Sequence, residues 1–176
     1  MGGWNGVISH GSGLMACCAT LAFLFILTGC EPPVSLPPEP HLTDVTLTTD
    51  GDIGQLLIGF EDGDGNFGLN QADTTEAFCP TCPFHHNVFC SYEELRDGQW
   101  TPILLDPAIG QVPFFYRAPR IEPTGQNKAL RGTITVELAP RFYLTSAWDT
   151  VRFAVHIVDR DLQSSDTLRT GFAVKP

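Results

Sequence analysis

Apolar and polar residues alternate in short segments over most of the chain, from residue 42 to the C-terminus. In residues 150–158, for example, Val151, Phe153, Val155 and Ile157 fall on one face of an extended backbone. A period of two is typical of a half-buried strand, because successive side chains of a strand point to opposite sides. The pattern predicts eight strands, at residues 42–47, 53–60, 86–95, 100–105, 112–121, 133–138, 150–158 and 167–174.

The segments between these strands are rich in Gly, Pro, Asp and Asn, which are ordinary turn residues. No window of useful length has a helical period bounded by capping residues. We therefore expect one all-β domain at residues 42–176, an antiparallel immunoglobulin-like β-sandwich of about seven or eight strands.

A different pattern occupies the N-terminus. An apolar stretch of about 15 residues ends at Leu27-Thr28-Gly29-Cys30, and it is too short to cross a bilayer comfortably. It fits the apolar region of a signal peptide, and its end matches a lipobox, in which an apolar and two small residues precede a lipid-modified cysteine. Residues 1–29 hold no Lys or Arg, although signal peptides usually begin with positive charge. A non-cleaved signal anchor is therefore the alternative.

We predict a signal peptide at residues 1–29 and a lipid on Cys30 that attaches the chain to the membrane. Residues 31–40 contain five prolines, so residues 30–41 are expected to form an extended tether. At about 3.1 Å per residue this tether reaches roughly 30 Å. These features predict a location at the outer membrane of the cell envelope, on either its periplasmic face or the cell surface.

The charged residues all lie beyond residue 29, and the formal net charge is −10. Such an acidic chain is unsuited to nucleic acid or to anionic lipid, because like charges repel. It is compatible with divalent cations.

An acidic loop, Glu61-Asp62-Gly63-Asp64-Gly65-Asn66-Phe67-Gly68, directly follows the second predicted strand. Its oxygen-bearing side chains alternate with Gly, which lets the backbone wrap closely around a hard cation such as Ca²⁺. Asp73 lies where an EF-hand that starts at Asp62 would place its last ligand, but Phe67 replaces the Gly required at the sixth position. The sequence therefore predicts a calcium loop of another kind, with an ordinary acidic turn as the alternative.

A second candidate is the Cys/His segment Cys79-Pro-Thr-Cys82-Pro-Phe-His85-His86, followed by Cys90. An exported compartment permits disulfides, so pairing Cys79 with Cys82, or one of them with Cys90, is the first interpretation. Zinc is the alternative, with Cys79, Cys82, His85, His86 and Cys90 as candidate ligands. Cys90 lies on the apolar face of its predicted strand, which also favours a buried core thiol.

Familiar catalytic patterns are absent from the sequence, which holds neither a G-x-S-x-G elbow nor a phosphate-binding loop. A redox-active Cys-x-x-Cys needs a helix N-terminus to stabilise its thiolate, and the pattern predicts a strand there. We therefore expect that the protein is not an enzyme.

Four segments carry a resemblance: Asp62-Gly-Asp-Gly-Asn-Phe-Gly68, Tyr92-Glu-Glu-Leu-Arg-Asp-Gly-Gln-Trp100, Pro123-Thr-Gly-Gln-Asn-Lys-Ala-Leu-Arg-Gly132 and Ile157-Val-Asp-Arg-Asp-Leu-Gln-Ser-Ser165. Together they resemble a group of small, uncharacterised envelope lipoproteins of Bacteroidota that carry a D-G-D-G-[DN]-[IFL]-G loop and an immunoglobulin-like domain. The resemblance covers most of residues 42–176 and implies export and a β-sandwich, but no particular activity. The chain departs from the group at residues 77–86, where the Cys/His segment is inserted.

In an immunoglobulin-like strand order, the acidic loop lies at the same end of the sandwich as the loops of residues 123–130 and 159–166. The expected calcium ligands are then Asp62, Asp64, Asn66, Asp73, Asp159 and Asp161. Alternatively, Lys128 neutralises these carboxylates without a metal. The tether is expected to leave from the same end.

The leading hypothesis is a membrane-anchored envelope lipoprotein that acts as a non-catalytic binding or structural module for an envelope protein partner, stiffened by calcium. One alternative is a metal-handling or enzymatic protein that uses the Cys/His segment. Another is a surface adhesin or glycan binder with an aromatic platform of Phe114, Phe115 and Tyr116, although these rings would equally fill the core.

Overall fold

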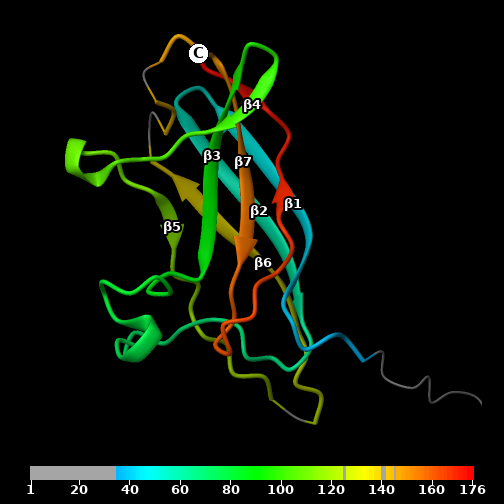
Figure 1. The fold of residues 1–176 in the computed structure, drawn as a ribbon. Helices are drawn as coiled ribbons and strands as arrows, with labels where there is room; N and C mark the ends of the chain where they lie inside the picture. The colour runs from blue at the N-terminus through cyan, green and yellow to red at the C-terminus, as the bar shows by residue number, and fades with distance from the viewer. Residues whose placement is uncertain (1–34, 125, 140–141, 145) are drawn as a thin grey trace, which may run out of the picture. The chain divides into compact units, whose positions relative to one another are not determined.

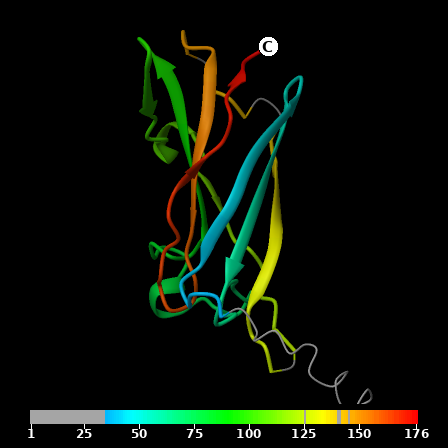
Figure 2. The ribbon, with the colours of Figure 1, turned by 90° about the vertical axis from the view of Figure 1, so that its right-hand side faces the viewer.

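The computed structural model describes residues 35–124, 126–139, 142–144 and 146–176. Two antiparallel sheets pack face to face in it (Figure 1, Figure 2). The first sheet contains, in order, β1 (His41–Asp50), β2 (Ile53–Asp62) and β6 (Leu130–Leu138). The second contains, in order, β4 (Gln99–Pro102), β3 (Val88–Arg96), β7 (Thr150–Ile157) and β8 (Leu168–Arg169), while β5 (Phe114–Tyr116) also pairs with β3 and β9 (Ala173–Val174) with β7. The predicted all-β sandwich is confirmed.

A tight hairpin joins β3 to β4. Asp97 and Gly98 both have positive φ, 51° and 79°. These angles build a two-residue turn whose twist matches that of the flanking strands. Glycine adopts such angles freely and Asp tolerates them, so this dipeptide sets the pairing of Arg96 with Gln99.

The core lies between the two sheets and takes side chains from both. Leu56 of β2 and Val155 and Ile157 of β7 have no exposed surface. Burying one such aliphatic side chain contributes about 1.5–3 kcal/mol. Every residue of the buried hydrophobic cluster lies between Leu42 and Ile157. A fragment of residues 35–176 therefore retains the complete described core.

The strand boundaries differ from the sequence prediction in the middle and at the end of the chain. The strand expected at residues 112–121 is confined to β5, because Pro113 and Pro119 lack the N–H that a strand ladder needs. The last expected strand is divided into β8 and β9. Two short 3₁₀ turns, η2 (Glu76–Phe78) and η3 (Pro107–Ile109), lie in the connections.

Several predictions concern residues outside this description. The signal peptide at residues 1–29, the lipid on Cys30 and the start of the tether up to residue 34 all lie there, and they stay predictions. In the part of the chain that is described, no helix is long and apolar enough to cross a bilayer.

Candidate functional site

The acidic loop begins at the end of β2 and contacts the end of the tether. The backbone N–H of Gly63 donates to the carbonyl oxygen of Pro37 at 3.0 Å. A Cβ atom at residue 63 would lie 2.1 Å from that oxygen, so only glycine allows the approach. The tether therefore joins the domain beside the acidic loop, as expected.

The three loops that an immunoglobulin-like order brings together do meet. Asn66 donates through Nδ2 to Oδ2 of Asp64 and to Oδ2 of Asp161, both at 3.0 Å. The second bond joins the acidic loop to the loop after β7. Gly65 packs against the third loop, since a Cβ atom at this position would lie 1.9 Å from the carbonyl oxygen of Lys128. The predicted convergence of the loops is confirmed.

Two of the carboxylates at this end are buried. Asp62 is 0% exposed and Asp159 is 1% exposed. One oxygen of each is bonded: Oδ2 of Asp62 accepts from the N–H of Phe67, and Oδ1 of Asp159 accepts from the N–H of Gln163, both at 2.8 Å. The other carboxylate oxygens, together with Oδ1 of Asn66, are buried and lack a hydrogen-bond partner among the described residues. Native structures rarely leave such atoms unsatisfied.

Burial and mutual repulsion disfavour the ionised forms of the carboxylates in these loops. Burial raises the pKa of Asp62 to about 6; the hydrogen bond from Phe67 opposes this shift, and the charges of Asp64 and Asp159 add to it. Burial likewise raises the pKa of Asp159, and the charges of Asp161 and Asp64 contribute. A cation placed among these groups would favour their ionised forms.

The unpartnered atoms of Asp62, Asn66 and Asp159 are all oxygens, from two carboxylates and one amide. Oxygen donors suit hard cations such as Ca²⁺, which accepts both carboxylate and amide oxygens. In the arrangement of the described residues, no group of three or more His, Cys, Asp or Glu side chains is poised to hold a metal ion. Any cation site here therefore depends on the amide of Asn66 as well as on the acids.

Two residues considered in the sequence analysis lie outside this group. Asp73 forms an ion pair with Arg160 and accepts a hydrogen bond from the N–H of Asn70 at 2.8 Å. The bond to Arg160 lowers the pKa of Asp73, so this residue is corrected from a candidate calcium ligand to the acidic member of an ion pair. The ammonium of Lys128 donates to the carbonyl oxygen of Pro123 at 3.4 Å and, within the described ranges, pairs with none of the loop carboxylates.

The Cys/His segment contains a disulfide between Cys79 and Cys82, as the first interpretation predicted. Zinc binds thiolates, so this pairing leaves no thiolate pair for the proposed ligand set of Cys79, Cys82, His85, His86 and Cys90. Cys90 is a free thiol that is 1% exposed. Burial raises its pKa to about 12, which keeps it protonated and unreactive at neutral pH.

Arg117 holds this segment in place, and sequence reasoning missed it. Its guanidinium donates to the carbonyl oxygens of His85, Asn70 and Asp73 at 2.6, 2.7 and 2.6 Å. Because the guanidinium contacts main-chain carbonyls, no partner side chain could be recognised in the sequence. The only sequence signal was an isolated cation after a strand rich in aromatic residues.

The aromatic residues of β5 alternate between the core and the surface. Phe114 packs against the core, with its ring 5.1 Å from that of Phe153. Phe115 is 40% exposed and lies 5.1 Å from the ring of Phe89. The three consecutive rings therefore do not form one flat platform.

Comparison of the chain with protein-family models, with curated proteins and with solved structures finds no match. The resemblance to envelope lipoproteins therefore stays a prediction.

Proposed function

We propose that the chain is a lipid-anchored module of the cell envelope that is not an enzyme, and that calcium stiffens its β-sandwich where the tether joins it. In this role it binds or supports an envelope protein partner. One observation supports the calcium part: Oδ1 of Asp62, Oδ1 of Asn66 and Oδ2 of Asp159 are buried without a hydrogen-bond partner among the described residues. An unpaired buried polar group costs about 1–3 kcal/mol, and a bound cation would offset this cost.

The hydrogen bonds of Asn66 support the same proposal. Its Nδ2 group bridges the carboxylates of Asp64 and Asp161, so a positively polarised group already lies between two negative ones. Oδ1 of the same amide stays unpartnered among the described residues, so it can bind a cation while Nδ2 keeps both hydrogen bonds. The proposed donors are then Oδ1 of Asp62, Oδ1 of Asn66 and Oδ2 of Asp159, held in place by the bonds of Asn66 to Asp64 and Asp161, and water or carbonyl oxygens complete the six to eight ligands that Ca²⁺ takes.

Calcium bound here would link elements that are far apart in the chain. The acidic loop contacts Pro37 of the tether through Gly63 and contacts the loop after β7 through Asn66 and Asp161. A cation shared by these loops would fix the direction in which the domain leaves its tether. Stiffening of this junction suits a module that presents a surface at a set distance from a membrane.

The anchor and the non-catalytic role are supported by the sequence. Leu27-Thr28-Gly29-Cys30 matches a lipobox, and residues 31–40 carry five prolines. The chain has no G-x-S-x-G elbow and no phosphate-binding loop. A soluble fragment of residues 35–176 that turns over esters, glycosides or peptides would contradict this part of the proposal.

Thermal unfolding of that fragment tests the calcium part. A ligand that binds only the folded state stabilises it by about 2.7 kcal/mol at a hundredfold excess over its dissociation constant. For a domain of this size that corresponds to a rise in Tm of about 9 °C. We expect this rise with Ca²⁺ relative to EDTA and a smaller one with Mg²⁺, which demands a tighter octahedral shell.

The matched variants are Asp62→Asn, Asp159→Asn and the exposed Asp50→Asn on β1. The first two should lose the calcium-dependent rise, and the third should keep it. An equal rise in all three variants would place the ion elsewhere and contradict the proposed site.

Lipid attachment has a separate test. The full-length protein, expressed in a bacterium that processes lipoproteins, should sediment with membranes and incorporate labelled fatty acid. Cys30→Ala should abolish both properties, because no thiol is then present to accept the lipid. Labelling that persists in this variant would contradict the anchor.

A further inference from the structure

The strand β6 forms one edge of the first sheet. Within the described residues it pairs with β2 alone. Its nine residues contain no proline, so each N–H on the outer side can donate. An unpaired edge of this length is a template for another strand.

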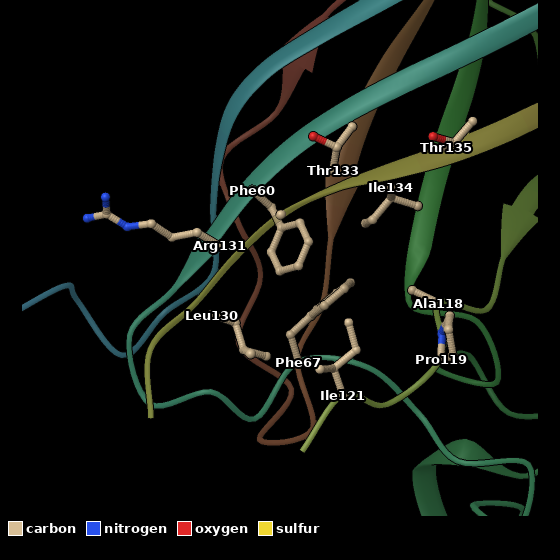
Figure 3. Close-up of a pocket in the computed structure, with 11 residues that line it drawn as sticks. Phe60, Phe67, Ala118, Pro119, Ile121, Leu130, Arg131, Thr133, Ile134 and Thr135 are labelled. Carbon is tan, nitrogen blue, oxygen red and sulfur yellow. The ribbon is translucent and has the colours of Figure 1, made fainter. Parts of the chain in front are cut away.

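An apolar groove lies directly under this edge (Figure 3). A cavity of about 310 Å³ opens between β6 and residues 118–121. A second cavity, of about 260 Å³, continues along the same strand. Figure 3 shows Phe60, Phe67 and Ile121 gathered below the strand. Ile121 is 58% exposed. A strand added to the edge would therefore cover apolar surface as well as pair with β6.

The sequence of β6 complements itself. It runs from Leu130 to Leu138, so an antiparallel copy that overlaps it fully is centred on Ile134. In that register Arg131 lies opposite Glu137 of the second copy, and Glu137 lies opposite Arg131 of the second copy. Registers moved by two residues in either direction shorten the overlap and lose both charge pairs.

The faces of the strand agree with this register. Arg131, Thr133, Thr135 and Glu137 are exposed, while Ile134 is half-buried on the side of the groove. In this register each odd-numbered residue pairs with an odd-numbered residue, and each even-numbered residue with an even-numbered one. Polar residues therefore pair with polar residues on the outer face, and apolar residues pair with each other on the inner face. Arg131 already contacts Glu61 of β2 at 3.3 Å, so it would lie between two carboxylates.

We propose that the protein forms a two-fold symmetric dimer in which β6 of one copy pairs antiparallel with β6 of the other, centred on Ile134. The two three-stranded sheets then become one continuous sheet of six strands. Each copy covers the groove edge of the other, and the interface is closed, as expected for a symmetric dimer.

Sedimentation equilibrium of the 35–176 fragment, up to millimolar concentration, tests the proposal. We expect a reversible dimer. Arg131→Glu and Glu137→Lys should each raise the dimer dissociation constant about tenfold, because each variant sets like charges opposite one another twice per dimer. The double variant Arg131→Glu/Glu137→Lys should restore the dimer, and an equimolar mixture of the two single variants should form a heterodimer.

Two controls separate this interface from general effects of charge. Asp50→Lys on β1, the opposite edge of the same sheet, and Glu61→Gln, which removes the partner of Arg131 on β2, should leave a dimer. A fragment that stays monomeric at every concentration would overturn the proposal and leave the edge open to a strand of a different protein. Single variants that dimerise as well as the unaltered fragment would also overturn it.

Discussion

The backbone N–H of Phe67 donates a hydrogen bond of 2.8 Å to Oδ2 of Asp62, five residues earlier in the acidic loop. The ring of Phe67 is 3% exposed and lies 4.8 Å from that of Phe60. One residue thus both anchors the loop in the core and orients the buried carboxylate. The other oxygen of Asp62 is left without a partner among the described residues, and the calcium proposal rests on that oxygen.

Replacement of Phe67 by Ala should therefore affect both stability and calcium binding. Truncating a buried Phe costs about 3–5 kcal/mol, and we expect about that loss in urea unfolding with EDTA present. The calcium-dependent rise in Tm should also shrink, because the loop loses its attachment to the core. Phe115→Ala, at a position that is 40% exposed, should cost less than about 1.5 kcal/mol and keep the calcium response. A large loss at Phe115 would show that its ring is core and not surface.

The pH dependence of stability should reveal the buried carboxylates. The pKa of Asp62 is about 6 in the folded chain and 3.8 for an ordinary Asp, so the unfolded chain binds fewer protons between these values. The free energy of unfolding in EDTA should therefore fall by up to about 3 kcal/mol as the pH rises from about 4 to about 6. Asp159, whose pKa is also raised, contributes in the same direction.

Two other carboxyl groups affect the free energy of unfolding at lower pH. The pKa values of Asp73 and Glu94 are lowered, so their contribution is present above about pH 4 and is lost below it. Chemical unfolding of Asp62→Asn across the same pH range is the control, and it should flatten the decline between pH 4 and pH 6. Calcium should have the same effect on the unaltered fragment, because the ion replaces the proton. A decline that is identical in Asp62→Asn would contradict this account.

A second buried carboxylate, that of Glu94, has hydrogen-bond partners that include two cations, so removing one of these cations should destabilise the fold. Glu94 is 0% exposed, and it accepts hydrogen bonds from Arg96, Ser146 and Lys175 at 2.7, 2.7 and 3.1 Å. Lys175→Met leaves a buried carboxylate short of a cation, and breaking a buried pair by removing one partner costs about 3–5 kcal/mol. We expect a loss toward the lower end, about 3 kcal/mol, since Arg96 stays.

A double-mutant cycle with Glu94→Gln measures the coupling. The paired variant should lose less than the sum of the two single losses, because the neutral amide no longer needs the ammonium. Simple additivity in urea unfolding would show that the two groups do not interact.

Thiol counting tests the Cys/His segment. The 35–176 fragment contains three cysteines, of which Cys79 and Cys82 are paired and Cys90 is free and buried. We expect no reactive thiol in the folded fragment, one after denaturation and three after reduction. Metal analysis should find no stoichiometric zinc. Three thiols without reduction, together with one equivalent of zinc, would instead restore the zinc interpretation.

The strands could be predicted from the sequence wherever alternation was uninterrupted. Val151, Phe153, Val155 and Ile157 were expected on one face, and all four are buried. The meeting of the acidic loop with Asp161 also followed from the sequence, because the connections of an immunoglobulin-like sandwich open at fixed ends. These predictions rely on periodicity and on strand order, both of which can be read along the chain.

Pairing between distant charges could not be predicted in the same way. Asp73 was expected at the calcium site because it stands at the right spacing from Asp62, but Arg160 pairs with it across 87 residues. Glu93 and Glu94 are adjacent acids that are both buried, which is rare for carboxylates unless they are paired. Glu94 has one cation nearby in the chain, Arg96, but its second cation, Lys175, lies 81 residues away. Spacing carries no information about such partners.

Calorimetric titration of the 35–176 fragment with CaCl₂, after removal of divalent ions with EDTA and exchange into metal-free buffer, measures calcium binding to the acidic loop itself. We expect one binding event of one Ca²⁺ per chain, absent in Asp62→Asn and in Asp159→Asn and unchanged in Asp50→Asn. Proton release should accompany binding near pH 6, where Asp62 is half protonated. No heat of binding in the unaltered fragment at millimolar Ca²⁺, or binding that survives in both loop variants, would rule out a calcium site at Asp62 and Asp159.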